Sequence, residues 1–361
     1  MVRKKDPKAT VDIACFHTLK KFELIEGYAK AWAQKLLNYK ECNGIVFIDC
    51  MCSSGVYQDS NGNEVFGTPI RIASYLSKIM QKYRDKQAWC YFNDLSTEKI
   101  ETLNNYLPSE TDNFHIVTKT IDGNALLKSI DNFTGLRLHN LLVYDPFEAA
   151  IDWEALIPFI NNWSDIIINH MVSDPIRAIP QVKRTSAKEK YERTYLTTLQ
   201  KLTTFSGDRE AFEKRIKEIM IALHRESGKR YYIASFPFFN RRNALVYNLI
   251  LGSGNIEGFK LFKKVAWQTF GGKSSTKNTH GTENQYVFDL SGEGAITTKT
   301  DENCYYPQDI VKYLHEKFKG RANVTLDEVW NALDEHPVFP SEGYRPQIKS
   351  GLTSTYGDMV A

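Results

Sequence analysis

The first half of the chain alternates short, wholly apolar runs with stretches of helical periodicity. The apolar runs have strand length and occupy residues 45–49, 88–93, 114–118, 140–145 and 165–170. Helical patterns precede and separate them, at 17–40, 68–84, 96–106, 124–131 and 152–161. A strand that is apolar throughout needs cover on both faces, and intervening helices favour parallel pairing. The sequence therefore predicts a doubly wound, mostly parallel, Rossmann-like α/β sheet.

The second half of the chain changes character. Residues 183–230 form a long polar stretch with helical spacing, two further strands follow at 231–236 and 244–251, and a helix is expected at 256–268. Residues 271–284 contain no apolar side chain, which predicts a mobile loop. We expect four units: the N-terminal helix with the Rossmann-like core (1–182), a basic helical insertion (183–230), completion of the sheet with a basic helix and the loop (231–284), and a small C-terminal helical subdomain, for which a winged-helix-like arrangement is one option (285–361).

The lengths of the apolar runs and the spacing of the cysteines exclude several classes of protein. No run approaches the roughly 20 residues that span a bilayer, and no apolar signal region follows the basic N-terminus. This predicts a soluble, cytoplasmic protein. The six cysteines are scattered, and Cys50 and Cys52 lack the two-residue spacing of zinc and redox pairs. We expect reduced thiols and no metal site.

Acidic residues follow the predicted strands. In doubly wound sheets ligands bind beyond the carboxyl ends of the strands, and the polar and turn residues found there are Asp49, Ser53, Gly55, Asp94 and Asp122. A single strand-end Asp is more often a helix cap than a ligand-binding group. However, the acidic residues after the first and second strands, together with an Asp-Pro-aromatic sequence after the fourth, have the layout of methyltransferases that use S-adenosylmethionine (SAM). Nicotinamide enzymes need a three-glycine fingerprint that this turn lacks.

The fourth strand ends in Asp145, Pro146 and Phe147. Amino-methyltransferases use a similar corner, in which the Asp and a backbone carbonyl accept hydrogen bonds from an exocyclic amine while the aromatic ring stacks on the base. A second proline of that corner is absent here. The alternative is a turn in which Pro146 stiffens the chain and Phe147 packs in the core. The residues leave both interpretations open.

Several segments together resemble the three-Cys-motif partner family. The segment from Thr18 to Trp32 resembles its entry helix, T-x-x-K-H-x-I-L-x-x-Y-L-x-x-W, and residues 47–57 resemble its F-I-D-G-F-A-G-P-G-x-Y motif. Further matching positions are Gly67, Pro69, Asp145, Trp153, Phe236, Pro237, Tyr247 and Trp267. Members of that family are similar to bacterial 23S rRNA adenine methyltransferases. The chain departs from the pattern at residues 50–54, Cys-Met-Cys-Ser-Ser in place of Gly-Phe-Ala-Gly-Pro, and has Phe22 in place of a histidine and Glu148 in place of a glycine.

The resemblance implies a SAM-type Rossmann domain, SAM as cofactor, and a working partnership with a three-cysteine radical-type protein. In such a site Asp49 would hold the amino group of SAM, Asp94 its ribose and Asp122 its adenine. Residues 145–147 would receive the target amine, with Lys21 near the mouth.

Charge is unevenly distributed along the chain. The formal net charge is +3, with 46 Lys and Arg against 43 Asp and Glu. Residues 183–230 hold 13 basic and 7 acidic side chains, and residues 240–280 hold 7 basic and one acidic. The basic residues Arg241, Arg242, Lys263 and Lys264 lie near aromatic ones, which predicts contact with the phosphates of nucleic acid, DNA or RNA. The alternative is a set of solvated helix faces.

Two hypotheses about function remain from the sequence. The chain is either a SAM-dependent methyltransferase acting on nucleic acid, at an exocyclic amine of a base, or a catalytically degenerate Rossmann scaffold. In the second case it would bind nucleic acid or a partner enzyme without methyl transfer.

Overall fold

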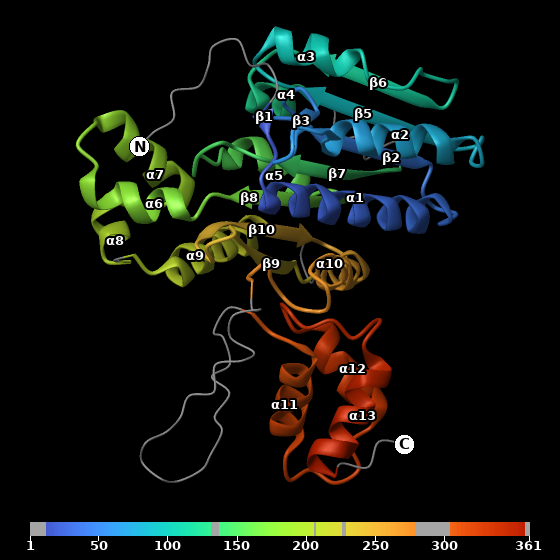
Figure 1. Cartoon of the computed structure of the whole chain (residues 1–361), viewed down its shortest axis with the longest axis vertical. Coiled ribbons are helices and arrows are strands. Elements are labelled where there is room, and N and C mark those ends of the chain that lie inside the picture. Colours follow the sequence, from blue (N-terminus) through green and yellow to red (C-terminus); the bar gives the residue numbers. More distant parts are fainter. Residues whose placement is uncertain (1–11, 131–136, 206, 226–228, 279–303, 358–361) are drawn as a thin grey trace.

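A seven-stranded sheet forms the centre of the computed structural model, which describes residues 12–130, 137–205, 207–225, 229–278 and 304–357 (Figure 1). Its strands are β2 (Gly44–Asp49), β5 (Gln87–Asn93), β6 (Phe114–Lys119), β7 (Leu138–Tyr144), β8 (Ser164–His170), β9 (Tyr232–Phe239) and β10 (Leu245–Ser253). They lie in the order β6-β5-β2-β7-β8-β10-β9. Six of them run in the same direction, and β10 runs in the opposite direction. The predicted mostly parallel α/β sheet is confirmed, and it is compatible with a Rossmann-like methyltransferase fold.

Helices cover both faces of this sheet. One face packs on α1 (Phe16–Leu37), α2 (Thr68–Met80) and α10 (Ile256–Thr269), and the other on α4 (Gly123–Ser129), α5 (Trp153–Ile160) and α9 (Arg209–Leu223). In β2, Ile45 and Phe47 join the first core, whereas Val46 and Ile48 join the second. This period-two alternation explains why the strand is apolar throughout. No helix in the described ranges is both long and apolar enough to cross a bilayer.

Some elements of the structure were not predicted. A small sheet consists of β1 (Asp12–Ile13), β3 (Val56–Gln58) and β4 (Glu64–Phe66), which are too short to show any periodicity. The stretch 183–230 is broken into α7 (Thr185–Tyr195), α8 (Leu199–Thr203) and α9, after a short α6 (Ser173–Ala178). By contrast, the helix α3 (Thr97–Asn104), between β5 and β6, lies within the helix predicted at 96–106.

The predicted loop 271–284 is packed in the part that the structure describes. Ser274, Ser275 and Thr276 are buried. Thr276 Oγ1 accepts from the backbone N–H of Phe239 at 2.7 Å, and the N–H of Ser274 donates to the carbonyl of Tyr305 at 3.0 Å. A segment with no apolar residue can be buried when its hydroxyl groups form hydrogen bonds with the backbone. The sequence pattern contained no sign of these partners. Residues 279–284 lie outside the described residues.

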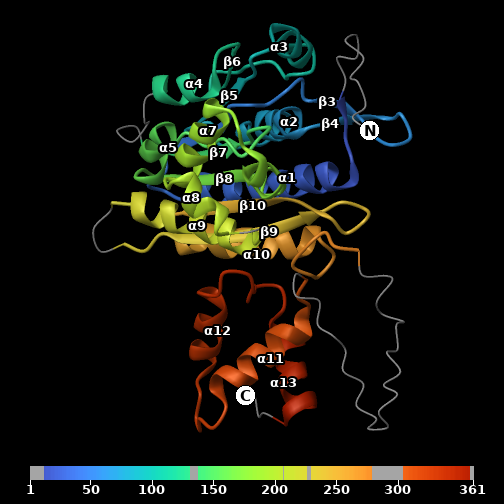
Figure 2. The ribbon, with the colours of Figure 1, turned by 90° about the vertical axis from the view of Figure 1, so that its left-hand side faces the viewer.

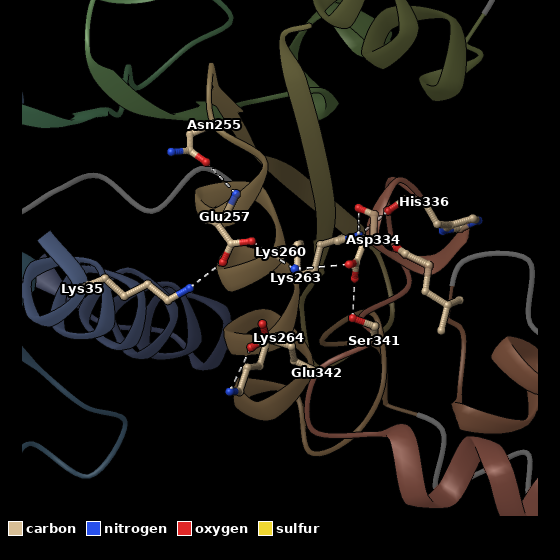
Figure 3. Close-up of polar contacts among 11 residues, drawn as sticks. Lys35, Asn255, Glu257, Lys260, Lys263, Lys264, Asp334, His336, Ser341 and Glu342 are labelled. Atoms are coloured by element: carbon tan, nitrogen blue, oxygen red, sulfur yellow. Dashed lines mark hydrogen bonds and ion pairs between the residues drawn. The ribbon is translucent and has the colours of Figure 1, made fainter. Parts of the chain in front are cut away.

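Three C-terminal helices lie beyond α10, at the far end of the molecule from β6 in both views (Figures 1 and 2). They are α11 (Pro307–Phe318), α12 (Leu326–Asp334) and α13 (Arg345–Tyr356). Lys263 of α10 is fully buried, and its Nζ donates to the carbonyls of Leu333, Asp334 and His336 at 2.8, 3.0 and 2.7 Å (Figure 3). The lysine thus satisfies carbonyls at the C-terminal end of α12 that have no partner within the helix.

This burial corrects the predicted contact between Lys263 and nucleic acid. An ammonium group with no exposed surface and three carbonyl partners cannot reach a phosphate. The neighbouring Lys264 is partly buried, and its Nζ lies 3.3 Å from Glu342 Oε2. Both lysines therefore attach the C-terminal helices to α10 instead of forming a basic surface.

Lys263→Met should loosen this attachment. The substitution keeps an unbranched apolar stem and removes the ammonium group. The carbonyls of Asp334 and His336 lose this donor, whereas that of Leu333 keeps the backbone N–H of His336 at 3.0 Å. We expect a cost of about 2–4 kcal/mol of unfolding free energy. Urea unfolding measures the loss, and hydrogen exchange should show faster opening of α11–α13. The matched control is Lys264→Met, which removes one partly exposed ion pair and should cost less than about 1 kcal/mol. Equal effects of the two substitutions would contradict this role of Lys263.

Candidate functional site

A cavity of about 530 Å³ opens at the carboxyl ends of β2, β7 and β8. Its walls include Lys21, Ser53, Tyr57, Asp145, Pro146, Phe147, Asn169 and Tyr247. The small sheet contributes one side through Ile13 of β1 and Tyr57 of β3. The cavity therefore lies where a doubly wound sheet binds its ligands.

The carboxylate of Asp145 is the central charged group of this cavity. It follows β7 directly and forms an ion pair with Lys21 of α1 through Oδ2. Its other oxygen, Oδ1, accepts from Nδ2 of Asn169 in β8. The Nζ of Lys21 also lies 5.5 Å from the centre of the Tyr247 ring. Two of the predicted site residues, Lys21 and Asp145, are thus brought together from distant parts of the chain.

A second carboxyl group, that of Asp49, lies buried at the end of β2. Its Oδ1 has no hydrogen-bond partner. Burial, followed by the negative charge of Asp145, raises the pKa of Asp49 to about 7. A buried carboxyl group with an unpartnered oxygen is costly in a folded protein. A donor or a positive charge supplied by a ligand would relieve that cost.

The turn after Asp49 has left-handed backbone conformations, which glycine adopts most easily, although Gly55 is the one glycine between residues 50 and 55. Ser53 and Gly55 both adopt left-handed backbone conformations, with φ of 58° and 67°. For Ser53 this costs about 1 kcal/mol relative to glycine. Cys50 is fully buried in the core on the α4 and α5 face, where its Sγ lies 3.5 Å from the carbonyl of Val143, and it does not line the cavity. Its side chain therefore leaves the cavity open.

The other predicted cofactor residues already have backbone partners. Asp94 accepts from the N–H of Ser53 at 3.1 Å and from the N–H of Ser96 at 2.9 Å. Asp122 caps α4, and the N–H groups of Asn124 and Ala125 donate to its Oδ1, each at 3.0 Å. Neither Asp94 nor Asp122 lines the cavity. Asp94 and Asp122 lie at the carboxyl ends of β5 and β6, the edge of the sheet at which ligands bind in doubly wound folds, but their carboxylates accept hydrogen bonds from the nearby backbone.

Sequence analysis assigned no role to Asn93, Asn169 or Tyr57. Asn93 Nδ2 donates to the carbonyls of Cys50 and Ile121 at 3.0 and 2.9 Å, which ties together the turns after β2 and β6. A polar residue that interrupts an apolar strand at its carboxyl end is the signal that could have identified both asparagines. Within the described ranges, no cluster of three or more His, Cys, Asp or Glu side chains is placed to hold a metal ion.

Phe147 lies at the mouth of the cavity with 74 % of its surface exposed. The Nζ of Lys99 is 5.6 Å from the centre of its ring. The alternative in which Phe147 packs in the core is therefore wrong. Pro146 is buried, and Glu148 pairs with Lys190 at 2.7 Å instead of entering the cavity.

Arg241 and Arg242 are exposed in the turn between β9 and β10. They line a second hollow of about 480 Å³ with Cys15 and other residues at the start of α1. Ile13 and His17 line both this hollow and the cavity. The arginine pair therefore lies beside the cavity, whereas Lys263 and Lys264 lie at the attachment of the C-terminal helices.

Comparisons with known proteins give only structural similarity. No protein-family model and no curated protein sequence matches the chain. Among solved structures, protein LPL1258 from Legionella pneumophila str. Philadelphia 1, described with the family model DUF519, is 12% identical with a TM-score of 0.39, over 71% of this chain and 92% of that chain. A loganic acid methyltransferase with SAH is 10% identical with a TM-score of 0.28, over 74% and 87% of the two chains. At these low scores, the fold assignment rests on the topology of the sheet.

Asp49→Asn should change how stability depends on pH. The pKa of about 7 in the folded chain exceeds the ordinary value of 3.8, so the native state holds a proton that the unfolded chain releases above about pH 4. Native stability therefore falls as pH rises from about 4 to 7. The variant should be more stable than the natural chain at pH 8, by about 2–4 kcal/mol, and the difference should vanish near pH 4.

Urea unfolding across this pH range measures the effect. The exposed Asp59 is the matched control, because hydrogen bonds from Asn63 lower its pKa. Asp59→Asn should therefore bring no gain in stability at pH 8. A difference between Asp49→Asn and the natural chain that stays constant with pH would refute the raised pKa of Asp49.

Proposed function

We propose that the chain is a SAM-dependent methyltransferase whose cavity receives the amine that is methylated. The observation that supports this most is the Asp145 carboxylate, which Lys21 and Asn169 hold in the cavity. Asp49 does not itself line the cavity, but it is close enough for the charge of Asp145 to raise its pKa, and its buried Oδ1 has no partner. A hydrogen-bond acceptor fixed at the carboxyl end of β7 suits an incoming N–H group. A buried carboxyl at the end of β2 suits an ammonium group.

The residues fit SAM best at its amino-acid end. Asp49 would hold the ammonium group, Asp94 the ribose hydroxyls and Asp122 the adenine. When bound, SAM supplies an electrophilic methyl group. The chain contributes orientation: Asp145 accepts a hydrogen bond from the amine and so directs the nitrogen lone pair, with no covalent intermediate. Asp145 is also the carboxylate placed to accept the proton that the methylated amine releases.

SAM should bind the natural chain with micromolar or tighter affinity, measured by calorimetry. Because the ionised form of Asp49 pairs with the ammonium group, affinity should rise as pH increases through about 7. Asp49→Asn should weaken binding at least about tenfold and remove that pH dependence. Asp59→Asn is the control and should bind as the natural chain does.

Asp145→Ala separates binding from catalysis. It should retain SAM binding and lose methyl transfer, because alanine has no side-chain acceptor for the amine while Asp49 remains. If the natural chain gives no binding heat with SAM at any pH, the methyltransferase proposal fails.

A degenerate scaffold is the second candidate, and the hydrogen bonds of Asp94 and Asp122 favour it. Both carboxylates already accept backbone N–H groups within the chain. In this case the fold would present nucleic acid, or a partner enzyme, to chemistry done elsewhere. The same SAM titration decides between the two candidates.

Nucleic acid is the substrate class that we infer for either candidate. Arg241 and Arg242 are exposed beside the cavity, and the exposed ring of Phe147 at its mouth suits stacking on a base. A partnership with a three-cysteine radical-type protein stays a prediction from the sequence resemblance.

Replacing both Arg241 and Arg242 by Gln should weaken binding of a mixed-sequence single strand, RNA or DNA. The slope of log affinity against log salt should fall by about 1.4, since two phosphate contacts are lost. Fluorescence anisotropy at several salt concentrations measures it. Arg137→Gln is the matched control, an exposed arginine before β7 at the opposite edge of the sheet. An unchanged slope in the double variant would place the nucleic acid elsewhere.

A further inference from the structure

A second polar cluster lies at the amino ends of β7 and β8, the edge of the sheet opposite the candidate site. It consists of His139 in β7, Asp165 in β8, and Tyr28 and Trp32 of α1. These four side chains are between 0% and 3% exposed. Three different elements thus bring titratable and polar groups together in the interior, away from the residues of the proposed methyl transfer.

Several polar atoms of this cluster have no hydrogen-bond partner. Asp165 Oδ2 accepts from the hydroxyl of Tyr28 at 2.8 Å, but Asp165 Oδ1 accepts from nothing. Neither ring nitrogen of His139 makes a hydrogen bond, although Nε2 lies 3.6 Å from Asp165 Oδ2. The Nε1 of Trp32 is also unpartnered. Each buried polar group left in this state costs about 1–3 kcal/mol, so a ligand that supplies partners would be bound favourably.

Two hollows reach this cluster from the surface. One of about 540 Å³ lies between α1 and α10, and one of about 470 Å³ lies beside β8. Both are lined by His139, Trp163 and Asp165. Gly258, in the first turn of α10, packs so closely on Asp165 that a Cβ there would lie 3.1 Å from both carboxylate oxygens. The lack of a side chain at this position keeps space in front of the carboxylate.

The walls of the larger hollow favour a positively charged ligand. The aromatic rings of Trp32, Trp163 and Tyr39 line it, and such rings attract cations. Its charged side chains are the carboxylates of Asp165 and Glu257 against the single ammonium of Lys35. Figure 3 shows Lys35 and Glu257 facing each other between α1 and α10. The Nζ of Lys35 lies 3.0 Å from Glu257 Oε2, and both side chains are about half exposed. Such a pair contributes little and can rearrange.

We propose that the hollow between α1 and α10 binds a small organic amine. The protonated nitrogen donates to Asp165 Oδ1, and the apolar part of the ligand contacts the rings of Trp32 and Trp163. This site is independent of SAM and of methyl transfer.

Benzylamine is the probe for this site, with benzyl alcohol as a neutral molecule of nearly the same shape. Calorimetry on the full chain should show saturable binding of benzylamine and at least about tenfold weaker binding of benzyl alcohol. Asp165→Asn should weaken benzylamine binding at least about tenfold, while the Asn oxygen still accepts from Tyr28. Equal binding of the two probes, or no saturable binding of benzylamine, would overturn the proposal and leave the cluster as a structural network.

Gly258→Ala provides a second variant in case Asp165→Asn does not fold. Its methyl group enters the space in front of Asp165, while alanine suits a helix better than glycine. Benzylamine binding should fall about tenfold. The added Cβ would also lie 3.0 Å from Ser253 Oγ, so urea unfolding is used to confirm that the variant is folded. Glu154→Gln, an exposed carboxylate on α5, is the control and should bind benzylamine as the natural chain does. Unweakened binding in a folded Gly258→Ala chain would place the amine elsewhere.

Discussion

Parallel pairing of β2 between β5 and β7 is the constraint on which the candidate site depends. In this register Asp49 lies opposite Phe92 on one side and Val143 on the other. The residues that follow these strands are therefore forced to the same edge. Asn93 then joins the turns after β2 and β6 through its amide group. The positions of Asp145, Asn169 and Tyr247 in the cavity therefore depend on β7, β8 and β10 of the central sheet.

Crowding of carboxyl groups is the electrostatic consequence of that pairing. Asp145 and Asp94 both disfavour ionisation of the buried Asp49, and Lys21 is the cation that offsets them. One ammonium cannot balance Asp94, Asp145 and an ionised Asp49 together, so the Asp49 carboxyl group keeps its proton up to about pH 7. Such an arrangement is unfavourable for an empty protein and favourable for a cationic ligand. The cluster around Asp165 at the opposite edge follows the same logic with fewer charges.

The sequence predicted the parallel strands well because the signal was strong. A run such as residues 45–49 is apolar on both faces, and a strand covered by helices on both faces is the natural way to bury it. The same reasoning could not find β1, β3 and β4, which have two or three residues each. Their positions depend on contacts with the turn after β2. Pairing of Lys21 with Asp145 was equally inaccessible, because the two residues are 124 positions apart.

Lys263 shows a signal that was present but misinterpreted. Two adjacent lysines on a short helix suggested a basic surface. Yet Lys263 lies four residues after Phe259 and four before Trp267, so all three occupy the same face of α10, and all three are buried. A lysine on the apolar face of a helix needs acceptors inside the protein. The acceptors belong to the end of α12, more than 60 residues later, so only the tertiary structure identifies them.

The two backbone hydrogen bonds that Asp94 accepts do not by themselves prevent it from binding a ribose. Each carboxylate oxygen has two lone pairs. Asp94 Oδ2 accepts one backbone hydrogen bond, from Ser53, and Oδ1 accepts one from Ser96. Both therefore retain capacity for ribose hydroxyls. Ser53 adopts a left-handed backbone conformation, and in this conformation its N–H donates to Asp94 Oδ2 at 3.1 Å. What decides between enzyme and scaffold is thus the amino-acid end of the site, where Asp49 has an unsatisfied oxygen and a pKa near 7.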